Sequence, residues 1–121
     1  MDEDNNLYVH GGIDWHKPLD ENDKGTFLWD RHMYEVAHYW KLTDTDATFG
    51  DYKKVFIGHT TTQYDPTNGG LGSMEPFMHS NLVALDTGGG WSGKLTIMNT
   101  DTLEFWGSDV VKELYPNVKG R

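Results

Sequence analysis

The stretch Lys53-Lys54-Val55-Phe56-Ile57-Gly58-His59-Thr60 decides how the rest of the chain is interpreted. Its three consecutive β-branched or aromatic residues, 55–57, predict a short buried strand that ends at the glycine. His59 follows that glycine, so its side chain is expected at the carboxyl end of the strand. Ligand and metal sites gather at this end of the strands in layered α/β folds. The stretch therefore predicts a candidate site residue at the edge of a sheet.

The same pattern of strand, histidine and glycine occurs near the N-terminus. Leu7-Tyr8-Val9 predicts a short strand that runs directly into His10-Gly11-Gly12-Ile13. An imidazole nitrogen is a good ligand for Zn, Fe or Mn ions, and the end of a strand holds it rigidly. His10 alone would be a hydrogen-bonded loop residue, but together with His59 it becomes a candidate metal ligand. Asp14-Trp15-His16 also resembles a metal motif, but it lies in a polar loop and is interpreted as solvated.

Length and charge set limits on the kind of protein. The 121 residues predict one domain, 1–121, with a modest core. The 19 acidic and 10 basic side chains give a formal net charge of -9, which disfavours nucleic acid and anionic membranes as partners. The absence of cysteine fits a reducing compartment. No apolar run reaches membrane-spanning length and the N-terminus is acidic, so a cytoplasmic location is expected.

One main helix is predicted over about 31–42. Asp30 stands at the N-cap position, and the apolar residues that follow it at helical spacing are Met33, Val36, Ala37 and Trp40. His32 and His38 lie off this apolar stripe and are expected on the surface. Arg31, in the first turn, could bind an anion in the bidentate geometry of a guanidinium group.

The remaining segments predict loops and further strands. The polar segment 19–24 is expected to be an exposed loop, and 60–80, which is rich in Gly and Pro, a long functional lid or rim. Leu82-Val83-Ala84-Leu85 predicts another buried strand, followed by Asp86. Residues 94–99 and 103–106 predict a C-terminal β-hairpin. The expected fold class is α+β.

Four motifs in this order resemble those of a known family. They are His10-Gly11-Gly12-Ile13, Leu28-Trp29-Asp30-Arg31, Phe56-Ile57-Gly58-His59-Thr60, and Leu85-Asp86-Thr87-Gly88 followed by Gly93-Lys94-Leu95-Thr96. From about Leu7 to Asp109, the chain resembles the C-terminal half of a calcineurin-like metallophosphoesterase. The most similar subgroup comprises bacterial and phage serine/threonine protein phosphatases and symmetrical diadenosine tetraphosphatases. The resemblance implies part of a four-layer α/β/β/α sandwich with mixed sheets.

The resemblance also implies a role for particular residues. His10 and His59 would bind the same one of two divalent ions, Mn or Fe/Zn, and Arg31 would bind the substrate phosphate. The segment from Asp86 to Gly93 would form a loop beside the site, with Trp91 near its rim. The implied activity is metal-dependent hydrolysis of a phosphoric ester, of the protein phosphatase type.

The chain departs from the family pattern in its metal ligands. The family's Asp-x-His strand end and its Gly-Asp-x-x-Asp-Arg and Gly-Asn-His motifs normally stand upstream, and none occurs here; Gly50-Asp51 continues as Tyr-Lys-Lys. We therefore expect the chain alone to be inactive and its partner to be the missing N-terminal half of the catalytic domain. Uncovered apolar faces predict self-association.

Other functions remain open at this point. The chain could be a non-catalytic binding or interaction module that keeps the phosphatase scaffold, or part of a symmetrical dinucleoside tetraphosphate hydrolase. It could also be an unrelated β-rich domain whose Trp and Tyr side chains bind a sugar or a protein. This last alternative requires His10 and His59 to lie far apart.

Overall fold

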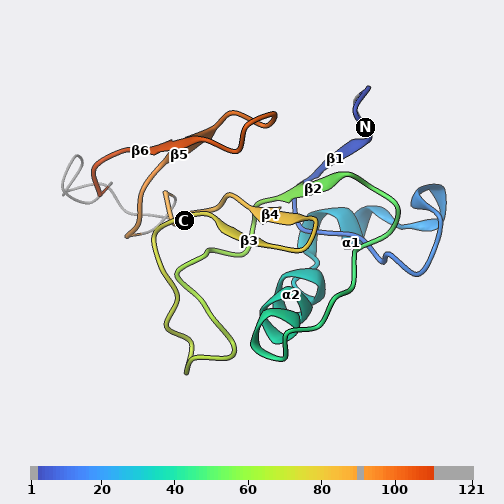
Figure 1. Cartoon of the computed structure of the whole chain (residues 1–121), viewed down its shortest axis with the longest axis horizontal. Coiled ribbons are helices and arrows are strands. Elements are labelled where there is room, and N and C mark those ends of the chain that lie inside the picture. The colour runs from blue at the N-terminus through green and yellow to red at the C-terminus, as the bar shows by residue number, and fades with distance from the viewer. Residues whose placement is uncertain (1–2, 90–91, 111–121) are drawn as a thin grey trace.

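The structure is a computed structural model that describes residues 3–89 and 92–110. It confirms the α+β class, with one four-stranded mixed sheet, one two-stranded sheet and short helices (Figure 1). The helices are η1 (Leu19–Glu21), α1 (Lys24–Trp29) and α2 (His32–Leu42). None of the described helices is long and apolar enough to span a bilayer.

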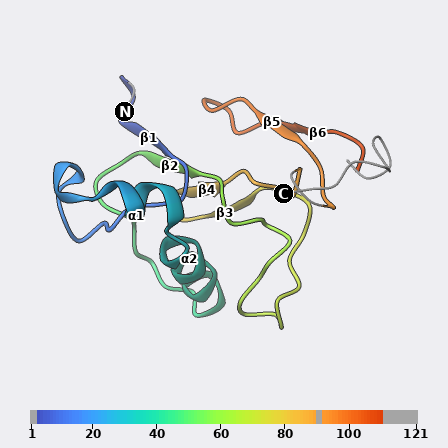
Figure 2. The ribbon, with the colours of Figure 1, turned by 180° about the vertical axis from the view of Figure 1, so that it is seen from behind.

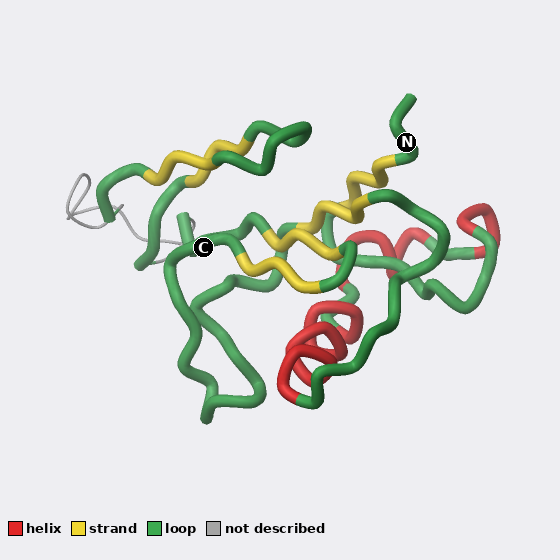
Figure 3. The backbone as a smooth tube through the Cα atoms, viewed as in Figure 1, coloured by secondary structure: helices red, strands yellow, loops and turns green. Residues whose placement is uncertain are grey.

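The four-stranded sheet has the order β1-β2-β4-β3 (Figure 3). Its strands are β1 (Asn6–Val9), β2 (Lys54–Ile57), β4 (Leu82–Ala84) and β3 (Phe77–His79). β1, β2 and β4 are parallel, whereas β3 pairs antiparallel with β4 at the edge. The strands that lead to His10, His59 and Asp86 therefore lie in one sheet with their carboxyl ends at the same edge.

The core lies between α2 and one face of this sheet. Alternate strand residues such as Leu7, Val55 and Leu82 point to this face and are buried, because side chains alternate along a strand. α2 covers them with Met33 and Ala37, both fully buried. Full burial of an apolar side chain contributes about 1.5–3 kcal/mol, so this face accounts for much of the stability of the chain. The helix predicted over 31–42 is confirmed.

The loop predicted over 19–24 is wrong, because η1 and the start of α1 occupy this segment. Asp23 caps α1: its Oδ1 accepts a hydrogen bond from the Thr26 backbone N–H at 2.8 Å. A six-residue helix is too short to show the periodicity by which helices are found in a sequence. Its fixed position comes from a distant contact, in which Gly11 N–H donates to Phe27 O at 2.6 Å.

Two predictions around α2 are also wrong. The segment 60–80 is not all loop, because residues 77–79 form the edge strand β3. His38 is buried rather than on the surface, with only 6% of the residue exposed. Its imidazole stacks on Phe77 with ring centroids 3.8 Å apart. The helical pattern could not show this, because the residue that covers His38 comes from the unpredicted strand.

The C-terminal hairpin is confirmed. Its strands are β5 (Thr96–Met98) and β6 (Phe105–Gly107), antiparallel with Ile97 opposite Trp106. The hairpin lies on the opposite side of the four-stranded sheet from α2, as both views show (Figures 1 and 2). Thr87 connects the segment after β4 to the hairpin by donating from Oγ1 to Lys94 O at 2.7 Å.

Candidate functional site

His10 and His59 come together at the carboxyl edge of the main sheet. The parallel register pairs Val9 with Ile57, so the residues that follow these strands emerge side by side. The two imidazole ring centroids are 5.1 Å apart, with an angle of 49° between the ring planes. The fold thus brings two histidines that are distant in sequence close together in space. This proximity contradicts the unrelated β-rich alternative, which required them to lie far apart.

The backbone at His59 is strained. Its φ is +61°, and Thr60 N–H donates to Gly58 O at 2.6 Å across it. This combination is typical of the classic γ-turn, which is rare. A left-handed conformation costs a residue with a Cβ about 1–2 kcal/mol, and strain of this kind clusters at functional sites. Asn5, Asp44, Ser80 and Leu103 also have a positive φ, so the conformation is compatible with a functional role for His59 but does not by itself indicate one.

Trp29 is a neighbour of this pair that the sequence analysis did not assign. Its indole meets the His59 ring edge to face, with centroids 5.4 Å apart, and 68% of the residue is exposed. Trp29 is the last residue of α1, the helix that the sequence pattern did not reveal. The sequence could have indicated a role for Trp29, because this residue directly precedes Asp30 and Arg31 in one of the four motifs.

The junction between α1 and α2 packs against the turn that follows His10. The N-cap position of α2 is Arg31 rather than Asp30, but the Asp30 carboxylate still caps the first turn by accepting a hydrogen bond from Met33 N–H at 3.1 Å. A Cβ added to Gly11 would lie 2.8 Å from the backbone N of Asp30, so only glycine fits there. Burial raises the pKa of Asp30, and the hydrogen bond from Met33 partly offsets this rise. The half-buried Asp30 carboxylate thus helps to hold this turn in place.

Arg31 and Asp86, the other predicted site residues, have different surroundings. Arg31 is exposed at the start of α2. Partial burial and the Glu35 carboxylate raise the pKa of Tyr64, and the Arg31 guanidinium opposes that rise, so Arg31 lies near this loop residue. Asp86 follows β4, and its Oδ1 accepts from Gly88 N–H at 3.1 Å. Trp91 lies outside the described residues.

The donor set fits part of a metal site. Within residues 3–89 and 92–110, no group of three or more His, Asp or Glu side chains could hold a metal ion. His10 and His59 supply two nitrogen donors, whereas a structural zinc site, for example, uses about four ligands. The remaining donors of a complete site would have to come from other residues. Two imidazole nitrogens are thus fewer donors than a complete metal site needs.

A search of protein-family models finds no family that matches this chain, and a search of curated proteins finds no match either. The residues and their geometry are therefore the basis of the functional argument.

Proposed function

We propose that this chain supplies half of a dinuclear metal site that hydrolyses a phosphoric ester. One observation carries the proposal: His10 and His59 converge at the carboxyl ends of adjacent parallel strands, with the second held in a strained turn. The resemblance of the four motifs to calcineurin-like metallophosphoesterases agrees with this assignment. The position of the β5–β6 hairpin, opposite α2, is compatible with the two-sheet sandwich of that family.

Each residue has a distinct role in this proposal. His10 and His59 hold one divalent ion, Mn, Fe or Zn, through neutral imidazole nitrogens. When bound, such ions polarise phosphoryl oxygens and lower the pKa of a coordinated water. Arg31 pairs with the phosphoryl oxygens through its guanidinium group, and the loop that begins at Asp86 borders the substrate. A polypeptide that carries the missing carboxylate and asparagine ligands completes the sandwich and the site.

The first test measures metal binding by the chain itself. Zn²⁺ is titrated into chain carrying ¹⁵N-labelled histidine, and the imidazole signals are followed by NMR. We expect His10 and His59 to shift together and saturably, and His10→Ala or His59→Ala to abolish the shift of the other ring. His32→Ala, which removes an exposed histidine elsewhere, is the control and should change nothing. Separate or absent responses of the two rings would contradict a shared ion.

The second test measures catalysis. With Mn²⁺ and an aryl phosphate, the chain alone should not turn over, because the bridging carboxylate of a two-metal site is missing. Activity should appear when an upstream half with the Asp-x-His, Gly-Asp-x-x-Asp-Arg and Gly-Asn-His motifs is added as a second polypeptide. Robust metal-dependent activity of the 121 residues alone would overturn the proposal.

Substitutions in this assembled enzyme separate the two roles. Arg31→Ala should lower kcat by about 100- to 1,000-fold, the usual loss for one donor to transition-state charge. Excess metal should not restore it. His59→Ala should instead lower metal occupancy, so excess Mn²⁺ should restore part of the activity. Equal responses of both variants to added metal would contradict this division.

A non-catalytic interaction module is the second candidate. It is favoured by the incomplete set of metal ligands within the described residues. This candidate predicts that the upstream half binds the chain without generating activity, so the same assay distinguishes it.

A further inference from the structure

One buried imidazole, that of His38, lies in the middle of α2. Its ring stacks on Phe77 and meets Tyr34 edge to face, with centroids 3.8 Å and 4.6 Å away. Nδ1 lies 3.3 Å from Asp65 Oδ1, whereas Nε2 is buried and has no hydrogen-bond partner. A polar atom that is buried without a partner is unfavourable, because it has lost its hydrogen bonds to water. Its presence therefore needs an explanation.

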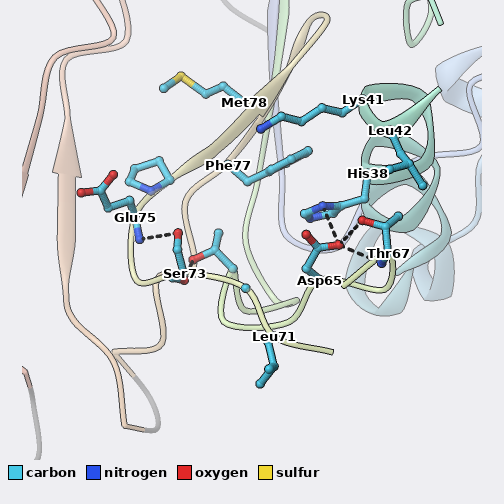
Figure 4. Close-up of a pocket in the computed structure, with 13 residues that line it drawn as sticks. His38, Lys41, Leu42, Asp65, Thr67, Leu71, Ser73, Glu75, Phe77 and Met78 are labelled. Carbon is cyan, nitrogen blue, oxygen red and sulfur yellow. Dashed lines mark hydrogen bonds and ion pairs between the residues drawn. The ribbon is translucent and has the colours of Figure 1, made fainter. Parts of the chain in front are cut away.

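His38 forms part of the lining of a pocket of about 690 Å³ between α2, the loop 62–76 and β3. This volume is typical of small-molecule sites, which range over about 300–1,000 Å³. The His38 ring reaches from α2 toward Asp65 and Phe77 and forms one wall (Figure 4). Leu42 and Leu71 add apolar surface, and Lys41 and Glu75 add charge. We call this cavity the His38 pocket.

The protonation of His38 and Asp65 determines what this pocket can bind. Burial lowers the pKa of His38 by more than the nearby Asp65 carboxylate raises it. Burial alone would raise the pKa of Asp65, but two hydrogen bonds from Thr67, at 2.8 Å and 2.6 Å, together with nearby charges lower it overall. At neutral pH the pair is therefore a neutral imidazole beside a carboxylate. The carboxylate holds the proton on Nδ1, so Nε2 is an acceptor.

The other polar groups of the pocket restrict the ligand further. Within the described residues, the ion pair and hydrogen bonds of the Asp65 carboxylate all go to Oδ1, so its Oδ2 remains an acceptor, as does the Glu75 carboxylate. Lys41 is the cationic donor, with Nζ 5.5 Å from the centroid of the Phe77 ring. An anion would face two carboxylates, and an ammonium ion, which only donates, would leave Lys41 unpaired. Hydroxyl groups both donate and accept, and so suit this mixture.

We propose that the His38 pocket binds a small neutral polyhydroxylated molecule, a sugar or polyol, with one hydroxyl donating to His38 Nε2. Further hydroxyls bond to Asp65 and Lys41, while the C–H face of the ligand packs on Leu42 and Leu71. Because Nε2 is closed off from water, lining side chains give way slightly as the ligand enters. The site is independent of the metal pair and of the proposed phosphoesterase activity.

The test follows the imidazole ¹⁵N signals of His38 in the full chain by NMR. D-glucose is the neutral probe, and D-glucosamine and D-gluconate are its cationic and anionic counterparts. We expect glucose to shift Nε2 saturably toward the value of a hydrogen-bonded acceptor, with the charged probes binding at least about tenfold more weakly. Tenfold corresponds to the loss of about one hydrogen bond.

Two variants and one control make the result specific. His38→Phe keeps the stack on Phe77 but removes Nε2, and Asp65→Asn keeps the shape of the carboxylate without its charge. Both should weaken glucose binding by about tenfold or more. His32→Phe, on the same helix but outside the pocket, should bind as the parent chain does. If His38→Phe does not fold, Asp65→Asn decides.

Three outcomes would overturn the proposal. One is a free chain in which Nε2 already shows the shift of a hydrogen-bonded acceptor, because a buried water then satisfies it. Another is the absence of any response to glucose. A third is equal binding of glucose and its charged counterparts, which would mean that the polar groups of the pocket do not select the ligand.

Discussion

At the residue scale, His59 combines backbone strain with a candidate ligand role, and substitution separates the two. His59→Ala and His59→Gly both remove the imidazole, but only glycine adopts a φ of +61° without steric cost. We expect the glycine variant to be more stable than the alanine variant by about 1 kcal/mol. Urea unfolding of the two variants measures this difference. Equal stabilities would mean that the turn relaxes when the imidazole is lost.

His38 should make stability depend on pH. Because burial lowers the pKa of His38 below the ordinary histidine value of 6.5, the unfolded chain takes up a proton first as the pH falls. The stabilising contribution of the neutral ring is complete above about 6.5 and is lost as the pH falls toward the folded-state pKa. Asp65 opposes this loss, and Lys41 and Tyr34 are the other titratable groups that face the ring.

The measurement is the urea midpoint between pH 8 and pH 5 for the parent chain and for His38→Phe. The parent should lose stability on acidification more steeply than the variant, since the variant has no imidazole at this position. If the urea midpoints of the two chains depended on pH in the same way, the pKa of His38 would be the same in the folded and the unfolded chain.

The sequence could predict which histidines follow the strands at the sheet edge but not how each is held. A strand followed by histidine is a local signal, so His10 and His59 were identifiable. The positive φ of His59 was not, because glycine stands at position 58 and His59 itself carries the strain. Trp29 and His38 acquire their surroundings from elements that are distant in sequence. Their roles therefore require the structure.

At the element scale, Asp30 fixes the start of α2 through its hydrogen bond to Met33 N–H. Asp30→Ala should reduce the free energy of unfolding by about 1 kcal/mol, the usual value of an N-cap. Asp30→Asn keeps an acceptor and removes a half-buried charge whose pKa burial raises, so it should cost less. Urea unfolding compares both with the parent. If asparagine destabilised as much as alanine, the charge rather than the cap would be responsible.

The elements that the sequence revealed are those with a repeated local pattern. α2 shows helical periodicity over 11 residues, and the hairpin and the buried strands show runs of β-branched and aromatic residues. α1 has six residues and β3 has three, too few for either period to appear. These short elements are positioned by pairing with β4 and by the turn at Gly11. Their existence depends on tertiary contacts.

At the scale of the whole molecule, apolar surface is concentrated on the C-terminal hairpin. Ile97 and Trp106 face each other across its two strands and are 72% and 58% exposed. Leu95, two residues before Ile97, is also exposed. Single exposed apolar residues are normal, but a cluster on one two-stranded element is a typical site of association. Two strands alone are marginally stable in water, which adds to the tendency to find a partner.

We therefore predict that the chain self-associates through this hairpin. The net charge of -9 opposes association, so added salt should strengthen it by screening the repulsion between copies. The double variant Ile97→Thr/Trp106→Thr keeps residues that favour strands but removes the apolar pair, and it should sediment as a smaller species at every salt concentration. Leu71→Thr, which replaces an equally exposed leucine in a separate loop, is the matched control and should behave as the parent does.

Sedimentation velocity over a range of protein and salt concentrations measures this self-association. A parent chain that stays monomeric in high salt, or a double variant that associates as strongly as the control, would show that the hairpin is not the contact surface. If the proposed upstream half covers this hairpin, adding it should dissociate the self-associated chain in the same experiment.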